Sequence, residues 1–340
     1  MSIGIDKLAH INNPALSDIL LAHSAAEGTG VVAIGDLPKL LNAGNLKMPD
    51  SDETIAEHHS QFCNRNLLDN WYFANSVNQK GQDEYSGGYG IDRWKSDGAT
   101  VLNDGSVAFS SNFYQKVPVE EFKKRFLGKQ LTLSALYTDG TLEFGTLTVS
   151  TQYPSSNQIL FATPAGLAVA LTTDGGPQIF RRQYTNKGVV AVKIEFGSHQ
   201  TLAHKEGSKW VLNEIPDYAT ELAKCQRYFW RYKFIGEWSK TAFIQAFTAT
   251  RLEGQFIAPV QMRTLLTVKT NIGDDELIAT KNANVDIPVK YKGVIACGDT
   301  YRNLRLTFEP LDSSKVVLGD TYFLRNQNNK NIYLDFDANL

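Results

Sequence analysis

The segment Asn66–Trp94, with the sequence NLLDNWYFANSVNQKGQDEYSGGYGIDRW, is the most informative stretch of this chain of 340 residues. It combines two Trp, three Tyr and one Phe with a run of Gly, Asn and Ser. Large aromatic rings suit the faces of β-strands, whereas Gly, Asn and Ser suit the turns that join strands. The segment holds no assembled catalytic constellation. It therefore predicts part of an aromatic-rich β-sandwich.

Tight turns extend this prediction along the chain. Asn103–Gly105 and Thr138–Gly140 each end in Asp-Gly, and glycine supplies the positive φ that a tight β-turn demands. Strand-like apolar or alternating runs occur at 99–102, 106–109, 130–137, 141–144 and 189–196. A short helix is predicted over Pro118–Gly128, because proline opens it and glycine closes it. This pattern favours a mainly β fold, a jelly-roll β-sandwich, over an open α/β sheet.

The chain divides into three predicted units. Residues 1–62 form a small N-terminal segment and linker, residues 63–213 the sandwich, and residues 214–340 a smaller β-rich module. The first unit contains a predicted hairpin and then a short helix, but it has too little apolar sequence for a core of its own. We therefore expect it to dock on another protein. The candidate attachment residues are Ile34, Asp36, Leu37, Leu40 and Leu41.

A helix is predicted to begin after Asp217 and to give way to an aromatic strand near Tyr228. The strand is unusually rich in large side chains that are typical of subunit interfaces. Symmetric association would bury such a cluster. We therefore predict a homo-oligomer, either a trimer or another symmetric assembly. The candidate interface residues are Tyr228, Phe229, Trp230, Arg231 and Tyr232.

The bulk composition excludes several classes of protein. The chain has 34 basic and 36 acidic side chains and a formal net charge of −2, so nothing indicates nucleic-acid binding. No apolar run approaches the ~20 residues that a bilayer-spanning helix needs, and no signal peptide is apparent, so we expect synthesis in a cytosol and no membrane insertion. Cys63, Cys225 and Cys297 are scattered and are interpreted as reduced thiols. No metal site and no cofactor is predicted.

The motifs of common enzymes are absent from the sequence. It has no Gly-x-Ser-x-Gly, no His-Glu-x-x-His and no phosphate-binding loop. Asp69, Asp83, Glu84 and Asp92 raise the alternatives of a glycosidase carboxylate pair or a structural Ca²⁺ site, but the favoured interpretation is that Asp69 and Asp92 accept from backbone donors at turn and strand ends. No catalytic residue is therefore assigned.

Aromatic side chains beside hydrogen-bonding groups suggest a glycan-binding surface, because a sugar ring packs its C–H face on an aromatic plane. The candidate residues are Tyr85, Tyr89, Asp92, Arg93 and Trp94. Trp71 and Trp94 lie in strand-like apolar runs, so core packing is the favoured interpretation for both, with sugar binding as the alternative for Trp94.

Several phrases resemble those of the jelly-roll module in bacteriophage and prophage tail and fibre proteins. They run from the Asn66–Trp94 segment through Lys-Ile-Glu-Phe-Gly and Thr-Leu-Ala to Glu-Leu-Ala-Lys-Cys-Gln-Arg-Tyr-Phe and Ala-Pro-Val-Gln-Met-Arg, which ends at Arg263. The resemblance implies a virion fibre or decoration protein, held to the capsid or tail by its N-terminal segment and binding host or environmental glycans. A polysaccharide-degrading tail enzyme and a purely structural head or collar protein are the alternatives.

Overall fold

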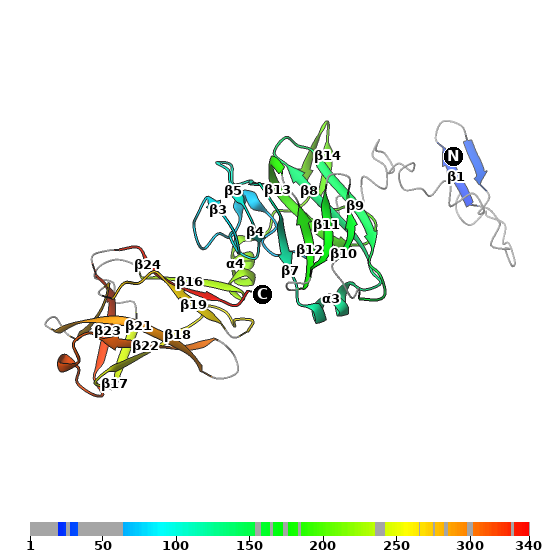
Figure 1. Cartoon of the computed structure of the whole chain (residues 1–340). Helices are drawn as coiled ribbons and strands as arrows, with labels where there is room; N and C mark the ends of the chain where they lie inside the picture. Colours follow the sequence, from blue (N-terminus) through cyan, green and yellow to red (C-terminus); the bar gives the residue numbers. More distant parts are fainter. Residues whose placement is uncertain are drawn as a thin grey trace.

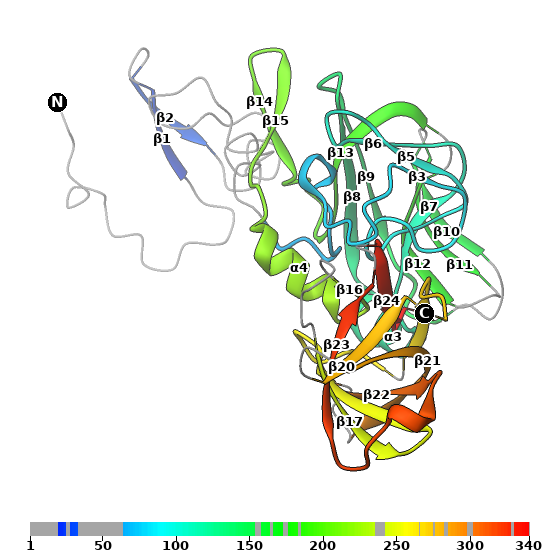
Figure 2. The same cartoon turned by 90° about the vertical axis from the view of Figure 1, so that its left-hand side faces the viewer.

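The computed structural model describes the chain from residue 20 to residue 339 with gaps at 25–27, 33–63, 154–157, 164–165, 173–175, 183–184, 235–241, 265, 275, 282–284, 298–301 and 328–329. Its architecture is mainly β, which confirms the predicted fold class. Figures 1 and 2 show a sandwich and a barrel that meet near the helix α4 (Tyr218–Gln226). Each module has its own hydrophobic core, and the predicted boundary at residue 213 falls between the two cores.

The sandwich consists of two antiparallel sheets. A six-stranded sheet has the order β3-β5-β6-β13-β8-β9, and a five-stranded sheet has the order β10-β11-β12-β7-β4. The β6·β13 pair of the first sheet continues as the β7·β12 pair of the second, as in a hairpin folded across a jelly roll. The strands are β3 (Glu84–Tyr85), β4 (Lys95–Ser96), β5 (Ala99–Val101), β6 (Val107–Phe109), β7 (Phe113–Lys116), β8 (Gln130–Tyr137), β9 (Leu142–Thr148), β10 (Gln158–Ala162), β11 (Leu167–Thr172), β12 (Gly176–Arg182) and β13 (Thr185–Phe196).

Aromatic rings fill the centre of the sandwich. The ring of Trp94 stacks on that of Phe113 with centroids 4.6 Å apart, and Phe109 stacks on Phe113 at 4.7 Å. Phe73, from the short 3-10 helix η3 (Phe73–Asn75), and Phe180 pack edge-on against Trp94. Trp71, Phe73, Tyr85 and Trp94 of the 66–94 segment therefore belong to the core of the module.

The predicted turns and helix of the sandwich are confirmed. Gly105 and Gly140 have φ of +81° and +77° at the turns that join β5 to β6 and β8 to β9. The helix α3 (Val119–Phe126) buries Phe122 and Phe126. A further hairpin, β14 (Ala203–Glu206) with β15 (Lys209–Leu212), ends the module.

The C-terminal module contains a closed antiparallel barrel of order β17-β18-β22-β21-β20-β23. Strict alternation of burial along β22 sends Leu304, Leu306 and Phe308 into its interior. A three-stranded sheet, β16-β24-β19, adjoins it. The elements are β16 (Phe229–Phe234), β17 (Ala242–Thr248), β18 (Arg251–Ile257), β19 (Thr267–Thr270), β20 (Leu277–Lys281), β21 (Val285–Cys297), β22 (Asn303–Pro310), η5 (Ser313–Lys315), β23 (Thr321–Asn326) and β24 (Ile332–Asp337).

The N-terminal hairpin is present as β1 (Leu20–Ser24) paired with β2 (Gly28–Val32), as the sequence predicted. The candidate attachment residues lie outside the residues that the structure describes; they are Ile34, Asp36, Leu37, Leu40 and Leu41. Attachment of the N-terminal segment to another virion protein stays a prediction.

The aromatic cluster at the start of the C-terminal module has its partners within the same chain. Strand β16 pairs with β24, Trp230 stacks on Phe336 at 4.9 Å, and Tyr232 packs edge-on against Phe256. Nε of Arg231 lies 2.6 Å from Oδ1 of Asp335. Packing within the chain therefore accounts for the large side chains that the sequence assigned to a subunit interface. The candidate interface residues Tyr228, Phe229, Trp230, Arg231 and Tyr232 therefore give no support to a homo-oligomer, which stays a prediction.

Candidate functional site

Asn70 ties the two ends of the 66–94 segment together. Its Nδ2 donates to the carbonyl oxygens of Val77 and Asp92, both at 2.9 Å, and its Oδ1 accepts from the backbone N–H of Val77 at 2.7 Å. Nε1 of Trp94 donates to the carbonyl of Asn70 at 2.9 Å. Asn70 is buried and has a φ of +52°, a conformation that Asn tolerates better than most residues. The polar residues of the segment thus hold its loops in place.

The same segment makes hydrogen bonds and a cation–π contact with α4 and with the residues that follow it. Oε2 of Glu221 accepts from the backbone N–H of Asn70 at 2.6 Å, and Nε2 of Gln79 donates to the carbonyl of Phe229 at 2.7 Å. The Arg93 guanidinium lies 3.5 Å from the centroid of the Tyr228 ring. Two phrases that stand more than a hundred residues apart in the sequence therefore meet in one junction.

A second buried network joins the Lys-Ile-Glu and Thr-Leu-Ala phrases. Nζ of Lys193 donates to Oγ1 of Thr201 at 2.9 Å and lies 3.9 Å from Oε2 of Glu195. Glu195 accepts from both the backbone N–H and the hydroxyl of Thr201. The side chains of Lys193 and Glu195 are both 0% exposed. These residues are part of the sandwich interior.

Burial corrects the predicted glycan-binding surface. Tyr85, Asp92 and Trp94 are 6%, 3% and 0% exposed, so the two rings cannot stack on a sugar and the carboxylate cannot bond to its hydroxyls; their assignment to such a surface is wrong. The core-packing interpretation is confirmed for Trp94. Tyr89 is half-buried, at an isolated bridge to Lys95. Arg93 lines the cavity described next, and Tyr85 lines a separate pocket with Glu84, Asp97 and Ser110.

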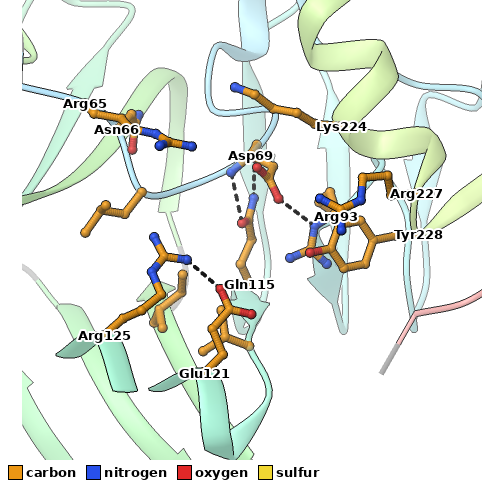
Figure 3. Close-up of a pocket in the computed structure, with 13 residues that line it drawn as sticks. Arg65, Asn66, Asp69, Arg93, Gln115, Glu121, Arg125, Lys224, Arg227 and Tyr228 are labelled. Carbon is orange, nitrogen blue, oxygen red and sulfur yellow. Dashed lines mark hydrogen bonds and ion pairs between the residues drawn. The ribbon is translucent and has the colours of Figure 1, made fainter. Parts of the chain in front are cut away.

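That cavity is a basic cleft of about 170 Å³ between the sandwich, α3 and α4. Figure 3 shows Glu121 and Arg125 of α3 on one side, Lys224, Arg227 and Tyr228 of the α4 region on the other, and Asp69 with Arg93 between them. The residues that line it are Arg65, Asn66, Leu67, Asp69, Arg93, Gln115, Val117, Glu121, Arg125, Ile179, Lys224, Arg227 and Tyr228. The term basic cleft is used below for this set.

Positive charge exceeds negative charge in the basic cleft. Five of its lining side chains are Arg or Lys, and two are carboxylates. Asp69 pairs with Nε of Arg93 at 3.1 Å, and Glu121 pairs with Arg125. Arg65 and Arg227 have no carboxylate partner among the described residues. A cleft with this surplus attracts an anionic group.

Arg93, which lines the basic cleft, carries a buried donor that no described residue satisfies. Its side chain is 3% exposed, and its Nη1 has no hydrogen-bond partner among the described residues. Burial lowers the pKa of Arg93, but the nearby Tyr228 and Asp69 raise it by more. The net shift is upward, so the guanidinium stays charged. A buried charged donor without a partner is costly unless a ligand or water satisfies it. A carboxylate in the cleft would do so.

Most residues of the basic cleft were not assigned as a site from the sequence. Their side chains come from segments around residues 65, 93, 115, 121 and 225, and each segment alone is ordinary. One signal was available on α4, because Glu221, Lys224 and Arg227 recur at intervals of three and so share a helix face.

The buried carboxyl of Asp92 makes stability depend on pH. Burial raises its pKa from 3.8 to about 7, although hydrogen bonds from Gln79 oppose the shift. The folded state thus binds the proton more tightly than the unfolded state, and this contribution to stability is lost as the pH rises through 7. We expect the free energy of unfolding to fall by about 1 kcal/mol more between pH 6 and 8 in the wild type than in Asp92→Asn. Urea unfolding of both proteins at each pH measures this, and parallel pH profiles would contradict it.

Comparison of the chain with protein-family models, curated proteins and solved structures gives no match. Within the described ranges, no helix is long and apolar enough to cross a membrane. No group of three or more His, Cys, Asp and Glu side chains placed to hold a metal ion occurs in the part of the chain that the structure describes. The site is therefore interpreted from its own chemistry.

Proposed function

We propose that this protein is a bacteriophage or prophage virion appendage, a fibre or decoration protein, that binds an acidic glycan through the basic cleft. The observation that carries the binding site is the buried, unpartnered Nη1 of Arg93 in a cleft where cationic groups outnumber carboxylates. The virion role rests on the sequence resemblance. The N-terminal segment would hold the protein to the capsid or tail, and the cleft would engage host or environmental glycans.

The size of the cleft and the types of its side chains favour the carboxylate of an acidic sugar. A space of about 170 Å³ admits one charged group and its immediate surroundings, not an extended polymer. Guanidinium groups such as those of Arg65 and Arg227 bind carboxylates in a planar, two-point geometry. The amides of Asn66 and Gln115 also line the cleft, but they are hydrogen-bonded to the backbone of Val192 and Asp69 and leave the arginines as the free donors. Arg65 and Arg227, which are exposed, would bind the sugar carboxylate at the mouth of the cleft, and Arg93 would donate a hydrogen bond to it from below.

Hydrolysis is the second candidate function, because two carboxylates, Asp69 and Glu121, line the same cleft. Each of them is engaged in an ion pair, Asp69 with Arg93 and Glu121 with Arg125. A glycosidase needs two carboxyl groups that face the scissile bond, and here a guanidinium occupies each of them. Binding without a chemical step fits this arrangement better. Release of reducing sugar that Asp69→Asn and Glu121→Gln both abolish would favour the enzyme.

The binding proposal predicts that oligogalacturonate, a uronic-acid oligomer, binds the full chain with a Kd of roughly 10⁻³ to 10⁻⁵ M. The double variant Arg65→Gln/Arg227→Gln should bind it at least tenfold more weakly, because it loses charge-assisted hydrogen bonds. Isothermal titration calorimetry measures both affinities. The methyl-esterified oligomer, which keeps the shape of the ligand but lacks its charge, should not bind in the cleft.

The matched control is Lys124→Gln/Lys129→Gln, which removes the same number of charges from exposed positions outside the cleft. It should retain wild-type affinity. Equal losses in the two double variants would show that attraction is only to overall charge. Undiminished binding by Arg65→Gln/Arg227→Gln would remove the cleft from the proposal.

A further inference from the structure

The outer face of the barrel carries large aromatic side chains that are exposed to solvent. Phe243 and Phe247 on β17 are 64% and 61% exposed, whereas the intervening Ile244 and Ala246 point into the barrel and are buried. Phe243 also packs against Phe323 of the neighbouring β23, with ring centroids 4.7 Å apart. Solvated single apolar residues are ordinary, but aromatic rings gathered on one face usually mark a binding site.

The strand register places polar groups between these rings. Gln245 lies between the two phenylalanines on β17 and pairs with Glu253 on β18, which in turn pairs with Thr307 on β22. In the adjacent row, Gln255 of β18 pairs with Arg305 of β22. The face therefore presents amide, carboxylate and guanidinium groups beside the two exposed rings.

A groove of about 450 Å³ follows this face and includes Phe243, Phe247, Gln245, Glu253, Gln255 and Arg305. This volume is in the range of small-ligand sites. Its carboxylate is fixed in place, because Arg251 lies 2.7 Å from Oε1 of Glu253 and Arg305 lies 3.3 Å from Oε2. A positioned carboxylate and neighbouring amides accept and donate hydrogen bonds to hydroxyl groups.

We propose that this groove is a second binding site, for an uncharged oligosaccharide whose pyranose rings pack on Phe243 and Phe247 while their hydroxyls reach Glu253, Gln245 and Gln255. The two rings are four residues apart on one strand, about 13 Å along it, so an oligosaccharide rather than a single sugar can contact both. The mixture of polar and aromatic groups distinguishes this occupant from a second copy of the chain, which would favour a drier apolar face. The site goes beyond the basic cleft, because it lies on the other module and recognises uncharged sugars.

The test is calorimetric titration of the full chain with hexasaccharides of glucose, N-acetylglucosamine, galactose and mannose. At least one should bind with a millimolar or lower Kd, and Phe243→Ala/Phe247→Ala should weaken its binding at least tenfold. Phe243→Trp, which keeps a stacking plane, should retain it. The control Leu311→Ala/Leu318→Ala removes apolar side chains, 50% and 63% exposed, that lie outside the groove, and it should bind like the wild type.

The substituted side chains are exposed, so folding should be preserved, and circular dichroism checks this. Arg65→Gln/Arg227→Gln should bind the uncharged hexasaccharide normally, which separates this site from the basic cleft. The proposal is overturned if no hexasaccharide binds the wild type, or if Phe243→Ala/Phe247→Ala binds as well as the wild type. It is also overturned if sedimentation shows that the groove instead joins two copies of the chain, with the same double variant monomeric.

Discussion

Replacement of Lys193 by Met should lower the free energy of unfolding by about 3 to 5 kcal/mol, because it leaves Glu195 as a buried charge without its cationic neighbour. Both side chains are 0% exposed, so water cannot take the place of the ammonium group without rearrangement of the core. Thr201 would lose the hydrogen bond that its hydroxyl accepts from Nζ at 2.9 Å. Urea unfolding of the full chain, followed by near-ultraviolet circular dichroism of the sandwich aromatics, measures the change.

The control for this prediction is the double variant Lys193→Met/Glu195→Gln. It removes both charges and keeps an amide oxygen that accepts from the backbone N–H of Thr201, a bond of 2.6 Å in the wild type. The double variant should be more stable than Lys193→Met alone, since replacing a whole buried pair costs less than breaking it. Additive destabilisation by the two substitutions would show that the two charges do not interact.

Replacement of Asn70 by Ala should lower the free energy of unfolding by about 4 kcal/mol, since three hydrogen bonds to buried backbone groups of Val77 and Asp92 are lost and only the Val77 carbonyl keeps another donor, the N–H of Asp92. The positive φ of 52° adds strain for Ala. Chemical unfolding, with the same optical signal, gives the magnitude.

Asn75→Ala is the matched control for Asn70→Ala, because Asn75 lies in the same segment but is exposed. It should change stability by less than about 0.5 kcal/mol. Asn70→Gly should be less damaging than Asn70→Ala, because it relieves the strain but not the lost hydrogen bonds. Equal stabilities of Asn70→Ala and the wild type would contradict the prediction, because they would show that the Asn70 hydrogen bonds do not stabilise the loops of residues 66–94.

The parts of the fold that depend on local chemistry could be predicted from the sequence. The Asp-Gly turns at Gly105 and Gly140 need only a positive φ, which glycine provides wherever it stands. The helix predicted after Asp217 spans Tyr218–Gln226, and the Asp217 side chain caps it by accepting from the backbone N–H of Thr220 at 2.8 Å. These signals lie within a few residues of one another.

The barrel and the basic cleft depend on contacts that no local pattern encodes. Closure of the barrel requires β17 to pair with β23, so that Ile244 lies opposite Tyr322, far away in the sequence. Similarly, Arg93 reaches the cleft only because its loop is fixed by Asn70 and covered by Tyr228. Composition showed that the 66–94 segment is aromatic and polar, but it could not show that Trp94 is buried and that Phe243 is exposed.

A crystal structure of the full chain with trigalacturonate tests the central claim, acidic-sugar binding in the basic cleft, most directly. The account predicts one ligand carboxylate within hydrogen-bond distance of Nη1 of Arg93, with Arg65 or Arg227 contacting the same group. The rings of Tyr85 and Trp94 should remain buried and make no contact with the sugar. A saturated crystal in which the ligand lies elsewhere, or in which the cleft holds only water, would contradict the account.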